Sequence, residues 1–155
     1  MLFDLALLCC PACQQSLTHD DNTLHCQQCG ARYGIHDGMP VLLTNTDTTT
    51  KLDTLDYDDH HGISDSSLTV IHTMWKTVLD ENRILGGNVL EIGCGTGQLT
   101  ATLAAMPTVK TIHATDISLD FLRMTKNRVN SPQSAVYYYA CDANQLPFTA
   151  TTFDL

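Results

Sequence analysis

Basic residues are scarce in this sequence. Lys and Arg together number 8, against 17 Asp and Glu, which gives a formal net charge of −9 at pH 7. A broad nucleic-acid interface needs clustered cations that displace the counterions of the phosphates. The charge balance therefore disfavours nucleic acid as a partner, and Arg32 is the only Lys or Arg in residues 1–43.

Long apolar runs and an export signal are also missing. The longest uncharged apolar stretch falls well short of the ~18–20 residues that cross a bilayer. The N-terminal stretch MLFDLALLCC has no positively charged start, and Asp4 interrupts its short apolar run, so it does not fit a secretory signal. We therefore expect a soluble protein of the reducing cytoplasm, with no membrane partner.

The composition changes twice along the 155 residues, of which 43% are hydrophobic. This is enough apolar material for a folded core. Residues 1–43 are rich in Cys, Gln and turn residues, and residues 44–65 are acidic, rich in Thr and Asp, and typical of a linker. Residues 66–155 alternate between strand-like and helix-like patterns. We therefore predict a small N-terminal unit, a linker and a larger domain.

Four of the seven cysteines form two C-x-x-C pairs with 12 residues between them, Cys10 with Cys13 and Cys26 with Cys29. The two-residue spacing lets both thiolates of a pair reach one ion at about 2.3 Å from each sulfur. Two such pairs give a closed site of four thiolates, which is typical of structural zinc. We therefore predict a zinc site that stabilises a unit too small to fold around an apolar core alone.

Other arrangements of these side chains remain open. The pairs could form disulfides or a redox couple, although a reducing compartment favours metal ligation. Cys9 adjoins the first pair and could compete with Cys10, but only Cys10 keeps the two-residue spacing. His25 and His36 could replace a ligand or donate a hydrogen bond to one, while packed or solvent-facing histidines are the commoner case.

The segment LLCCPACQQSLTHDDNTLHCQQCGARYGIHDGMPVLL also resembles a known family of small zinc ribbons. That family is typified by the activator subunit of eukaryotic tRNA, rRNA and protein methyltransferases. The matching features are the two cysteine pairs, Arg32-Tyr33 after the second pair, and the closing run from Asp37 to Leu43. The resemblance implies a docking and stabilising module and covers about a quarter of the chain.

The larger domain has the pattern of a parallel α/β sheet. Apolar residues recur at three- and four-residue steps over about 66–85, which predicts an amphipathic helix with Trp75 on its core-facing side. Strands and helices then alternate, as is typical of a doubly wound sheet with right-handed crossovers. The predicted strands are 88–92, 111–115 and 135–140, with a fourth opening at 153–155, and the predicted helices are 99–106 and 119–129.

A glycine-rich turn follows the first of these strands. The stretch Glu91-Ile92-Gly93-Cys94-Gly95-Thr96-Gly97 lies between a strand and a helix, where backbone can approach a ligand closely and the helix N-terminus offers free N–H groups. The dinucleotide fingerprint G-x-G-x-x-G would need Gly where Gln98 stands, and no G-x-x-x-x-G-K-[ST] phosphate loop is present. The pattern is E-x-G-x-G-x-G instead.

This turn and the elements after it resemble class I S-adenosylmethionine-dependent methyltransferases of the type 11 kind. VLEIGCGTGQLT is similar to the first motif of that family. Asp116 ends the second strand, 19 residues after Gly97, and Asp142 ends the third. Leu146-Pro147-Phe148 and Phe153-Asp154 are similar to the L-P-F and F-D segments of the family. The resemblance covers more than half of the chain and implies an incomplete Rossmann-like sheet behind the zinc ribbon.

The resemblance also implies where S-adenosylmethionine would bind. The three glycines would pass along its methionine part, and the glutamate before them would help hold its amino group. The aspartate after the second strand would take the ribose, and the one after the third strand the adenine. The implied residues, with one neighbour for each aspartate, are Glu91, Gly93, Gly95, Gly97, Asp116, Ile117, Asp142 and Ala143.

We therefore expect the N-terminal, cofactor-binding part of a methyltransferase that acts on a small molecule or a protein. Acceptor and general base are expected at the end of the fourth strand or later, so we assign no catalytic residue. Two alternatives remain open. The chain could be a non-catalytic zinc-ribbon regulator of another methyltransferase, or an RNA methyltransferase, which the shortage of cations disfavours.

The chain is expected to stop as its fourth strand begins. In the family the sheet runs 3-2-1-4-5-7-6, so the first strand of this sheet would be left as an apolar edge. Unpaired strand edges invite pairing with another chain. We therefore expect poor stability as an isolated monomer, and a homo- or hetero-oligomer that covers this edge.

Overall fold

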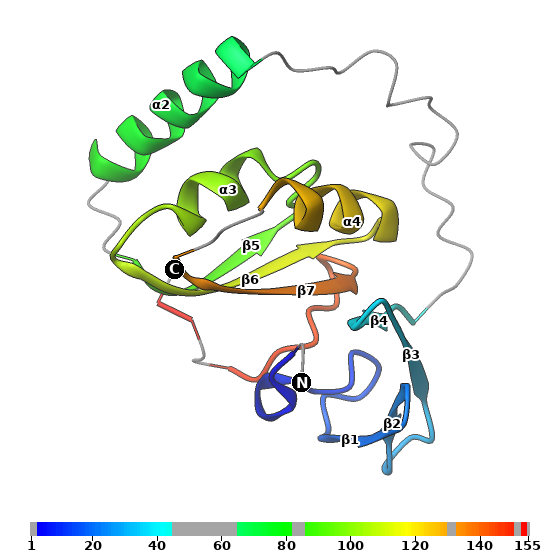
Figure 1. The fold of residues 1–155 in the computed structure, drawn as a ribbon. Helices are drawn as coiled ribbons and strands as arrows, with labels where there is room; N and C mark the ends of the chain where they lie inside the picture. The colour runs from blue at the N-terminus through cyan, green and yellow to red at the C-terminus, as the bar shows by residue number, and fades with distance from the viewer. Residues whose placement is uncertain (1–2, 45–64, 82–85, 130–132, 151–152, 155) are drawn as a thin grey trace.

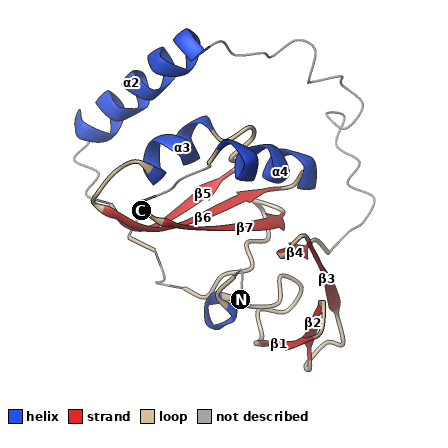
Figure 2. Cartoon of the chain, in the orientation of Figure 1, coloured by secondary structure: helices blue, strands red, loops and turns tan. Residues whose placement is uncertain are grey.

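The computed structural model describes residues 3–44, 65–81, 86–129, 133–150 and 153–154. These residues form one mixed sheet of seven strands in the order β1-β2-β3-β4-β7-β6-β5. Helices cover one face of the parallel part of this sheet, and the N-terminal unit lies on its other side, beyond β7 (Figure 1; Figure 2).

The parallel part confirms the α/β fold class. Its register joins Ile92 to Thr115 and Asp116 to Ala140, so the three strands end at a common edge of the sheet. Each element lies within two residues of its predicted bounds. The elements are β5 (Gly87–Ile92), α3 (Gln98–Ala104), β6 (Val109–Asp116), α4 (Leu119–Arg128) and β7 (Ala135–Cys141).

Side chains of these strands alternate between the two faces of the sheet, as the two-residue period requires. On the helix side, Ile112 and Ala114 of β6 pack with Tyr138 of β7, and Leu103 and Leu122 cover them from α3 and α4. Ile112 and Leu122 are completely buried. This apolar layer fixes the helices over the sheet and places their N-termini near the common strand edge.

The N-terminal unit is an antiparallel meander that continues into the parallel sheet. Its strands are β1 (Leu17–Asp20), β2 (Thr23–Cys26), β3 (Arg32–His36) and β4 (Met39–Leu42). Asp37 and Gly38 have φ of 54° and 80°, the left-handed conformations that a two-residue hairpin turn needs. β4 then pairs parallel with β7, Val41 opposite Ala140 and Leu42 opposite Cys141. The small unit and the larger domain therefore share one sheet.

The face of β7 that points away from the helices is also covered. The segment before the first cysteine pair, with the one-turn helix η1 (Leu5–Leu7), lies against residues 147–149. The backbone N–H of Cys9 donates to the carbonyl of Pro147 at 2.8 Å, and that of Thr149 donates to the carbonyl of Leu7 at 2.9 Å. The core formed here contains Phe3, Leu8, Cys10, Leu17, Leu24, Cys26, Tyr33, Leu42, Tyr139 and Cys141. We call this set the ribbon core.

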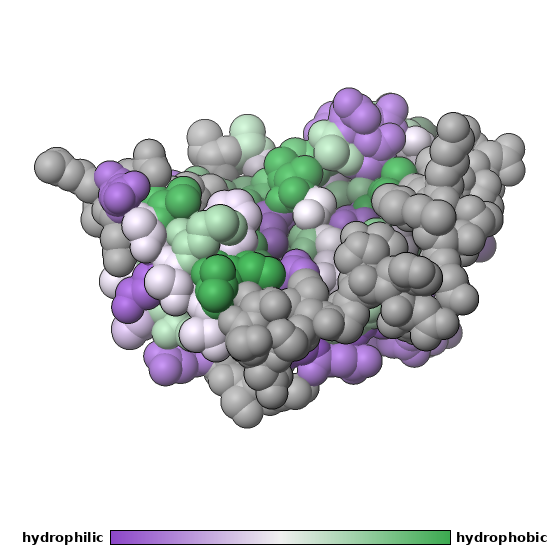
Figure 3. Space-filling view, turned by 90° about the horizontal axis from the view of Figure 1, so that it is seen from above, coloured by the Kyte–Doolittle hydropathy of each residue, from purple (hydrophilic) through white to green (hydrophobic). Residues whose placement is uncertain are grey.

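Helix α2 (Asp65–Glu81) matches the first predicted helix, whose residues 82–85 lie outside the described residues. It packs against α3 as an outer layer (Figure 1). Among the residues of the expected core-facing stripe whose burial the structure describes, Leu79 is buried, Trp75 is half-buried, and Met74 is 52% exposed. The expectation that this stripe faces the core therefore holds for Leu79 and fails for the exposed Met74, because α2 packs mainly against α3. Figure 3 views the molecule from above, the side on which α2 lies in Figure 1, and apolar side chains are visible on that surface.

The predicted opening of a fourth strand, residues 153–155, is described only at residues 153–154, which are not a strand. Phe153 and Asp154 have no regular secondary structure, although they lie beside the edge strand β5. The N–H of Asp154 donates to the carbonyl of Asn88, and the N–H of Asn88 donates to the Asp154 carboxylate, both at 2.8 Å. A side-chain oxygen thus takes the place of a main-chain acceptor, so no ladder forms.

Two further expectations concern the linker and the absence of a membrane-spanning segment. The predicted linker, residues 44–65, falls almost wholly outside them. Among the helices that the structure does describe, none combines the length and the apolar character that crossing a membrane requires.

Candidate functional site

The two cysteine pairs meet in one cluster. The sulfur atoms of Cys10, Cys13, Cys26 and Cys29 all lie within 4.8 Å of one another. The Cys10–Cys29 and Cys13–Cys26 sulfur distances are 3.7 and 3.4 Å, close to the ~3.8 Å that four sulfurs at about 2.3 Å from a tetrahedral ion would show. All four are free thiols rather than disulfides. Donor set and spacing therefore fit a zinc ion.

Tight backbone turns bring these sulfurs together. In the second pair, Gly30 has a φ of +76°, and its N–H donates to the carbonyl of Cys26 at 2.9 Å. The backbone N–H of Cys29 also reaches the Cys26 sulfur and lowers the pKa of Cys26 to about 7, which favours the thiolate form that binds metal. Glycine adopts this left-handed conformation without the steric cost that other residues meet.

The other candidate ligands lie outside this cluster. The thiol of Cys9 donates to the side-chain oxygen of Gln14 at 3.2 Å. His25 and His36 are not among the side chains that converge on the four sulfurs within the described ranges. The choice of Cys10 over Cys9, made on spacing, is therefore the one that the geometry supports.

The glycine turn closes the carboxyl end of β5. The N–H of Cys94 donates to the carbonyl of Thr115 at 2.8 Å, which continues the sheet pairing into the turn. A Cβ atom placed on Gly93 or Gly95 would meet nothing within 4 Å, whereas one on Gly97 would lie 2.7 Å from Thr125 of α4. The first two glycines therefore border open space that a ligand could fill, and the third allows α4 to pack closely.

Asp116 sits opposite this turn, at the end of β6. One of its carboxylate oxygens accepts from the N–H of Gly95 and the other from the N–H of Ser118, both at 2.9 Å. The side chain is 9% exposed. A carboxylate offers about four acceptor positions, so each oxygen keeps one for a ligand. Ile117, next in the chain, is half-buried at the start of the loop into α4.

Glu91 lies near the end of β5, two residues before Gly93. It is buried, and its carboxylate accepts from the Thr100 hydroxyl at 2.7 Å. Burial raises the pKa of Glu91 to about 7, and the hydrogen bonds from Thr100 lower it by less. The residue thus anchors α3 beneath the turn, a contact that the spacing of the motif does not reveal.

Asp142 and Ala143 follow β7 at the same edge. The Asp142 carboxylate accepts from both the backbone N–H and the side-chain amide of Asn144, each at 2.8 Å. It remains half-exposed, and Ala143 is exposed. The structure therefore brings all of the predicted cofactor residues to one edge of the sheet. Their contact with a cofactor stays a prediction.

Helix α4 supports the turn through residues that sequence reasoning did not assign to the site. The Thr125 hydroxyl donates to the carbonyl of Gly95 at 2.8 Å, and Arg128 donates to the carbonyl of Thr96 at 2.6 Å. No motif marks them, because a threonine or arginine on a helix usually reads as a surface or core position. Their role appears only when α4 is seen folded over the turn.

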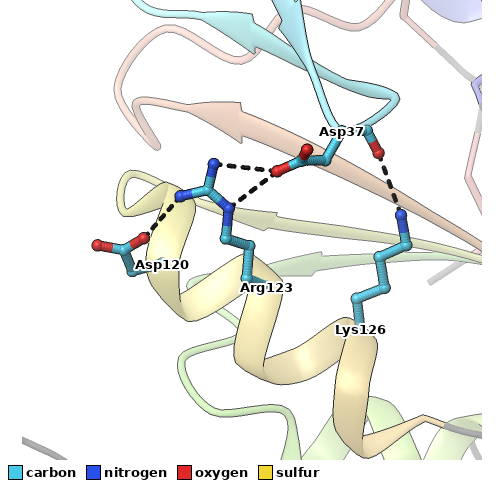
Figure 4. A network of polar contacts seen from close by, with 4 residues as sticks. All are labelled: Asp37, Asp120, Arg123 and Lys126. Atoms are coloured by element: carbon cyan, nitrogen blue, oxygen red, sulfur yellow. Dashed lines mark hydrogen bonds and ion pairs between the residues drawn. The ribbon is translucent and has the colours of Figure 1, made fainter.

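The same helix contacts the N-terminal unit. The Arg123 guanidinium lies 3.0 Å from the Asp37 carboxylate in the β3–β4 turn and 2.8 Å from Asp120, and Lys126 donates to the carbonyl of Asp37 at 3.1 Å (Figure 4). We call the bonds of Arg123 and Lys126 to Asp37 the α4–ribbon contact. α4 thus holds the glycine turn on one side and the ribbon turn on the other.

Comparison with known families assigns the two parts separately. Residues 89–155 match the family described as a methyltransferase domain, and residues 5–38 match the family of Trm112p-like proteins. The first match spans the glycine turn and both aspartates, and the second contains all four clustered cysteines.

Individual relatives agree with the first match. A ubiquinone/menaquinone biosynthesis C-methyltransferase UbiE from Burkholderia mallei (strain SAVP1) is 38% identical over 89 residues, which cover 55% of this chain and 36% of the relative. The crystal structure of the PH0226 protein from Pyrococcus horikoshii OT3 superposes with a TM-score of 0.51 at 26% identity, covering 59% of this chain and 40% of that one. The chain therefore spans about a third of the length of the curated relatives it matches. The family matches, the sheet and the four-cysteine cluster together support a class I S-adenosylmethionine-dependent methyltransferase domain in residues 89–155 and a Trm112-like zinc ribbon in residues 5–38.

Proposed function

We propose that the chain is the cofactor-binding part of a methyltransferase that transfers a methyl group from S-adenosylmethionine to a small molecule or a protein. One observation carries the proposal. The open space beside Gly93 and Gly95 lies at the carboxyl end of the parallel strands, where Asp116 and Asp142 also lie. Backbone without side chains, at the same end of the strands as two carboxylates, suits a nucleoside that carries an amino acid.

Each part of this edge has a proposed partner. The glycines would pass along the methionine part, Glu91 would help to hold its amino group, and the free acceptor positions of Asp116 would take the ribose hydroxyls. Asp142 would accept from the adenine amino group. Ile117 and Ala143 would flank these two rings. When bound, the cofactor supplies a methyl group on a sulfonium, and the chain contributes alignment and exclusion of water.

The acceptor is proposed only as a class. With 8 Lys and Arg against 17 Asp and Glu, the chain offers little for a nucleic-acid phosphate backbone. The UbiE relatives are named for quinone biosynthesis, but the likeness to them covers only 36% of their length. The likeness therefore supports the type of reaction and leaves the acceptor unassigned.

The ribbon is proposed to serve this same chain. Its strand β4 already pairs with β7, and its turn already contacts α4. Both contacts are made within the chain, so the last strand and the turn of the ribbon are covered without a second protein. We therefore favour a zinc-stabilised module that acts within the chain, in a reducing cytoplasm that keeps its thiols free.

The boundaries of the units remain a proposal. We keep residues 1–43 as the ribbon, 44–65 as the linker and 66–155 as the methyltransferase part. The pairing of β4 with β7 makes the ribbon and the methyltransferase part neighbours in one sheet, whatever the path of the chain between them.

Calorimetric titration with S-adenosylmethionine tests the proposal. It is done on this chain and on a version extended through the remaining strands of the domain, with Asp116→Ala and the control Asp120→Ala, an exposed carboxylate four residues further on. We expect Asp116→Ala to weaken binding at least tenfold, because two ribose hydrogen bonds are lost, each worth about 1 kcal/mol. Equal affinity of wild type and Asp116→Ala would reject the ribose assignment.

A further inference from the structure

The four cysteines of the cluster have unequal surroundings. Cys29 is exposed at the surface, whereas Cys10 is completely buried. The Cys10 sulfur lies 3.2 Å from the phenolic oxygen of Tyr33, which is itself only 4% exposed. Tyr33 belongs to β3 and lies outside both C-x-x-C pairs. A side chain from another element therefore reaches the most buried of the four sulfurs.

The direction of this hydrogen bond follows from the metal chemistry. A metal-bound cysteine is a thiolate and carries no proton, so the Tyr33 hydroxyl must be the donor. Four thiolates around a dication leave a net negative charge, and a buried sulfur cannot share its part of that charge with water.

We propose that Tyr33 is a positioning residue of the metal site, which holds the Cys10 thiolate by donating a hydrogen bond to it. The inference rests on the proposed zinc ion. Partners that hydrogen-bond to a metal ligand fix its orientation, and their removal typically lowers metal affinity about 10- to 100-fold. Tyr33 also belongs to the ribbon core, together with Leu42, Tyr139 and Cys141. One hydroxyl thus joins the metal site to the core against β7.

Zinc release from the full chain tests this role, using Tyr33→Phe and the matched control Tyr139→Phe. Tyr139 is a second buried phenol of the ribbon core, but its hydroxyl contacts Nδ1 of His113 at 3.1 Å and no sulfur. With a chromogenic chelator, we expect Tyr33→Phe to release zinc at least tenfold faster than wild type. Tyr139→Phe should release it at the wild-type rate.

Cobalt substitution gives a second readout, which a merely loosened core would not move. Loss of a hydrogen bond leaves the thiolate richer in electrons, so the sulfur-to-cobalt charge-transfer band should shift to longer wavelength in Tyr33→Phe and stay in place in Tyr139→Phe. If Tyr33→Phe releases zinc at the wild-type rate and its charge-transfer band does not shift, the inference is overturned. Equal changes of the release rate and the band in Tyr33→Phe and Tyr139→Phe would overturn it as well. A wild-type chain that binds no zinc would instead reject the metal site itself.

Discussion

Single residues decide what the glycine turn can accommodate. Gly93 and Gly97 both have left-handed φ, 72° and 83°, yet their surroundings differ. The space beside Gly93 is open, whereas Gly97 touches Thr125 of α4. The sequence marks both as members of one motif and does not reveal that one faces a candidate ligand space and the other a helix.

Alanine at these two positions should therefore act differently. Gly97→Ala combines left-handed strain with a clash, so we expect a loss of about 2–4 kcal/mol in the free energy of unfolding. Gly93→Ala should lose only about 1–2 kcal/mol from strain, while its methyl group enters the proposed cofactor space and weakens binding. Urea unfolding and calorimetry measure the two effects. Equal stability losses for both variants would contradict the packing role of Gly97.

Glu91 should give the stability of the chain a measurable pH dependence. Burial raises its pKa from the ordinary 4.5 to about 7. Between these values the folded chain holds more protons than the unfolded chain, so stability falls as pH rises through this window, by about 3 kcal/mol in all. Glu91→Gln removes this loss and keeps an acceptor for Thr100. The variant should gain stability relative to wild type between pH 5 and pH 8.

The other glutamate of the chain provides the control. Glu81 is exposed at the end of α2, so Glu81→Gln should follow the wild-type curve at every pH. His113 acts in the opposite direction, because burial lowers its pKa from the ordinary 6.5 to about 4. The stability that His113 contributes is therefore lost as the pH falls below 6.5. The difference between the Glu91→Gln and wild-type curves isolates Glu91. A stability difference between Glu91→Gln and wild type that stays constant from pH 5 to pH 8 would show that the pKa of the Glu91 carboxyl is not raised.

At the scale of elements, α4 links the ribbon turn with the glycine turn (Figure 4). The side chains of Arg123 and Asp37 are 45% and 61% exposed, so water and salt screen their attraction. A double-mutant cycle of Arg123→Ala and Asp37→Ala should give a coupling energy of about 0.2–1 kcal/mol. The coupling should shrink when the salt concentration is raised. A large coupling that is insensitive to salt would contradict this view of the α4–ribbon contact.

Local patterns in the sequence predicted the elements well and their long-range contacts poorly. β5 and β7 follow from short apolar runs bounded by turn residues, and α4 from the alternation of strand-like and helix-like segments. The pairing of β4 with β7 joins segments about a hundred residues apart, and nothing in either segment specifies its partner. The expectation that α2 faces the core had the same weakness. The period of the helix shows that it has an apolar stripe, but it does not show which element covers that stripe.

The candidate site was predictable where a motif carried it. The four cysteines follow from spacing, and the glycines and the two aspartates from their order after successive strands. Thr100, Thr125 and Arg128 were missed, because each supports the turn through a hydrogen bond that depends on how a helix is placed over it. Tyr33 was noticed only as part of a family pattern, and its contact with Cys10 needed the structure.

At the scale of the whole molecule, metal and sheet should unfold together. Cys10, Cys26 and Tyr33 lie in the same core as Tyr139 and Cys141 of β7. Removal of zinc with a chelator should therefore lower the melting temperature of the whole chain, in a single transition reported equally by far-UV circular dichroism and by tyrosine absorbance. A methyltransferase part that melts unchanged after zinc removal would contradict this coupling.

Hydrogen exchange with and without S-adenosylmethionine tests the central claim most directly, that the common strand edge is a cofactor site. At saturating cofactor, amide protection should rise at residues 93–97, 116–118 and 142–143, the three segments that end the parallel strands. It should stay unchanged in the ribbon strands β1 and β2. Saturable binding of S-adenosylmethionine with protection only outside these three segments would contradict this claim. So would a failure of the extended version of the chain to bind the cofactor.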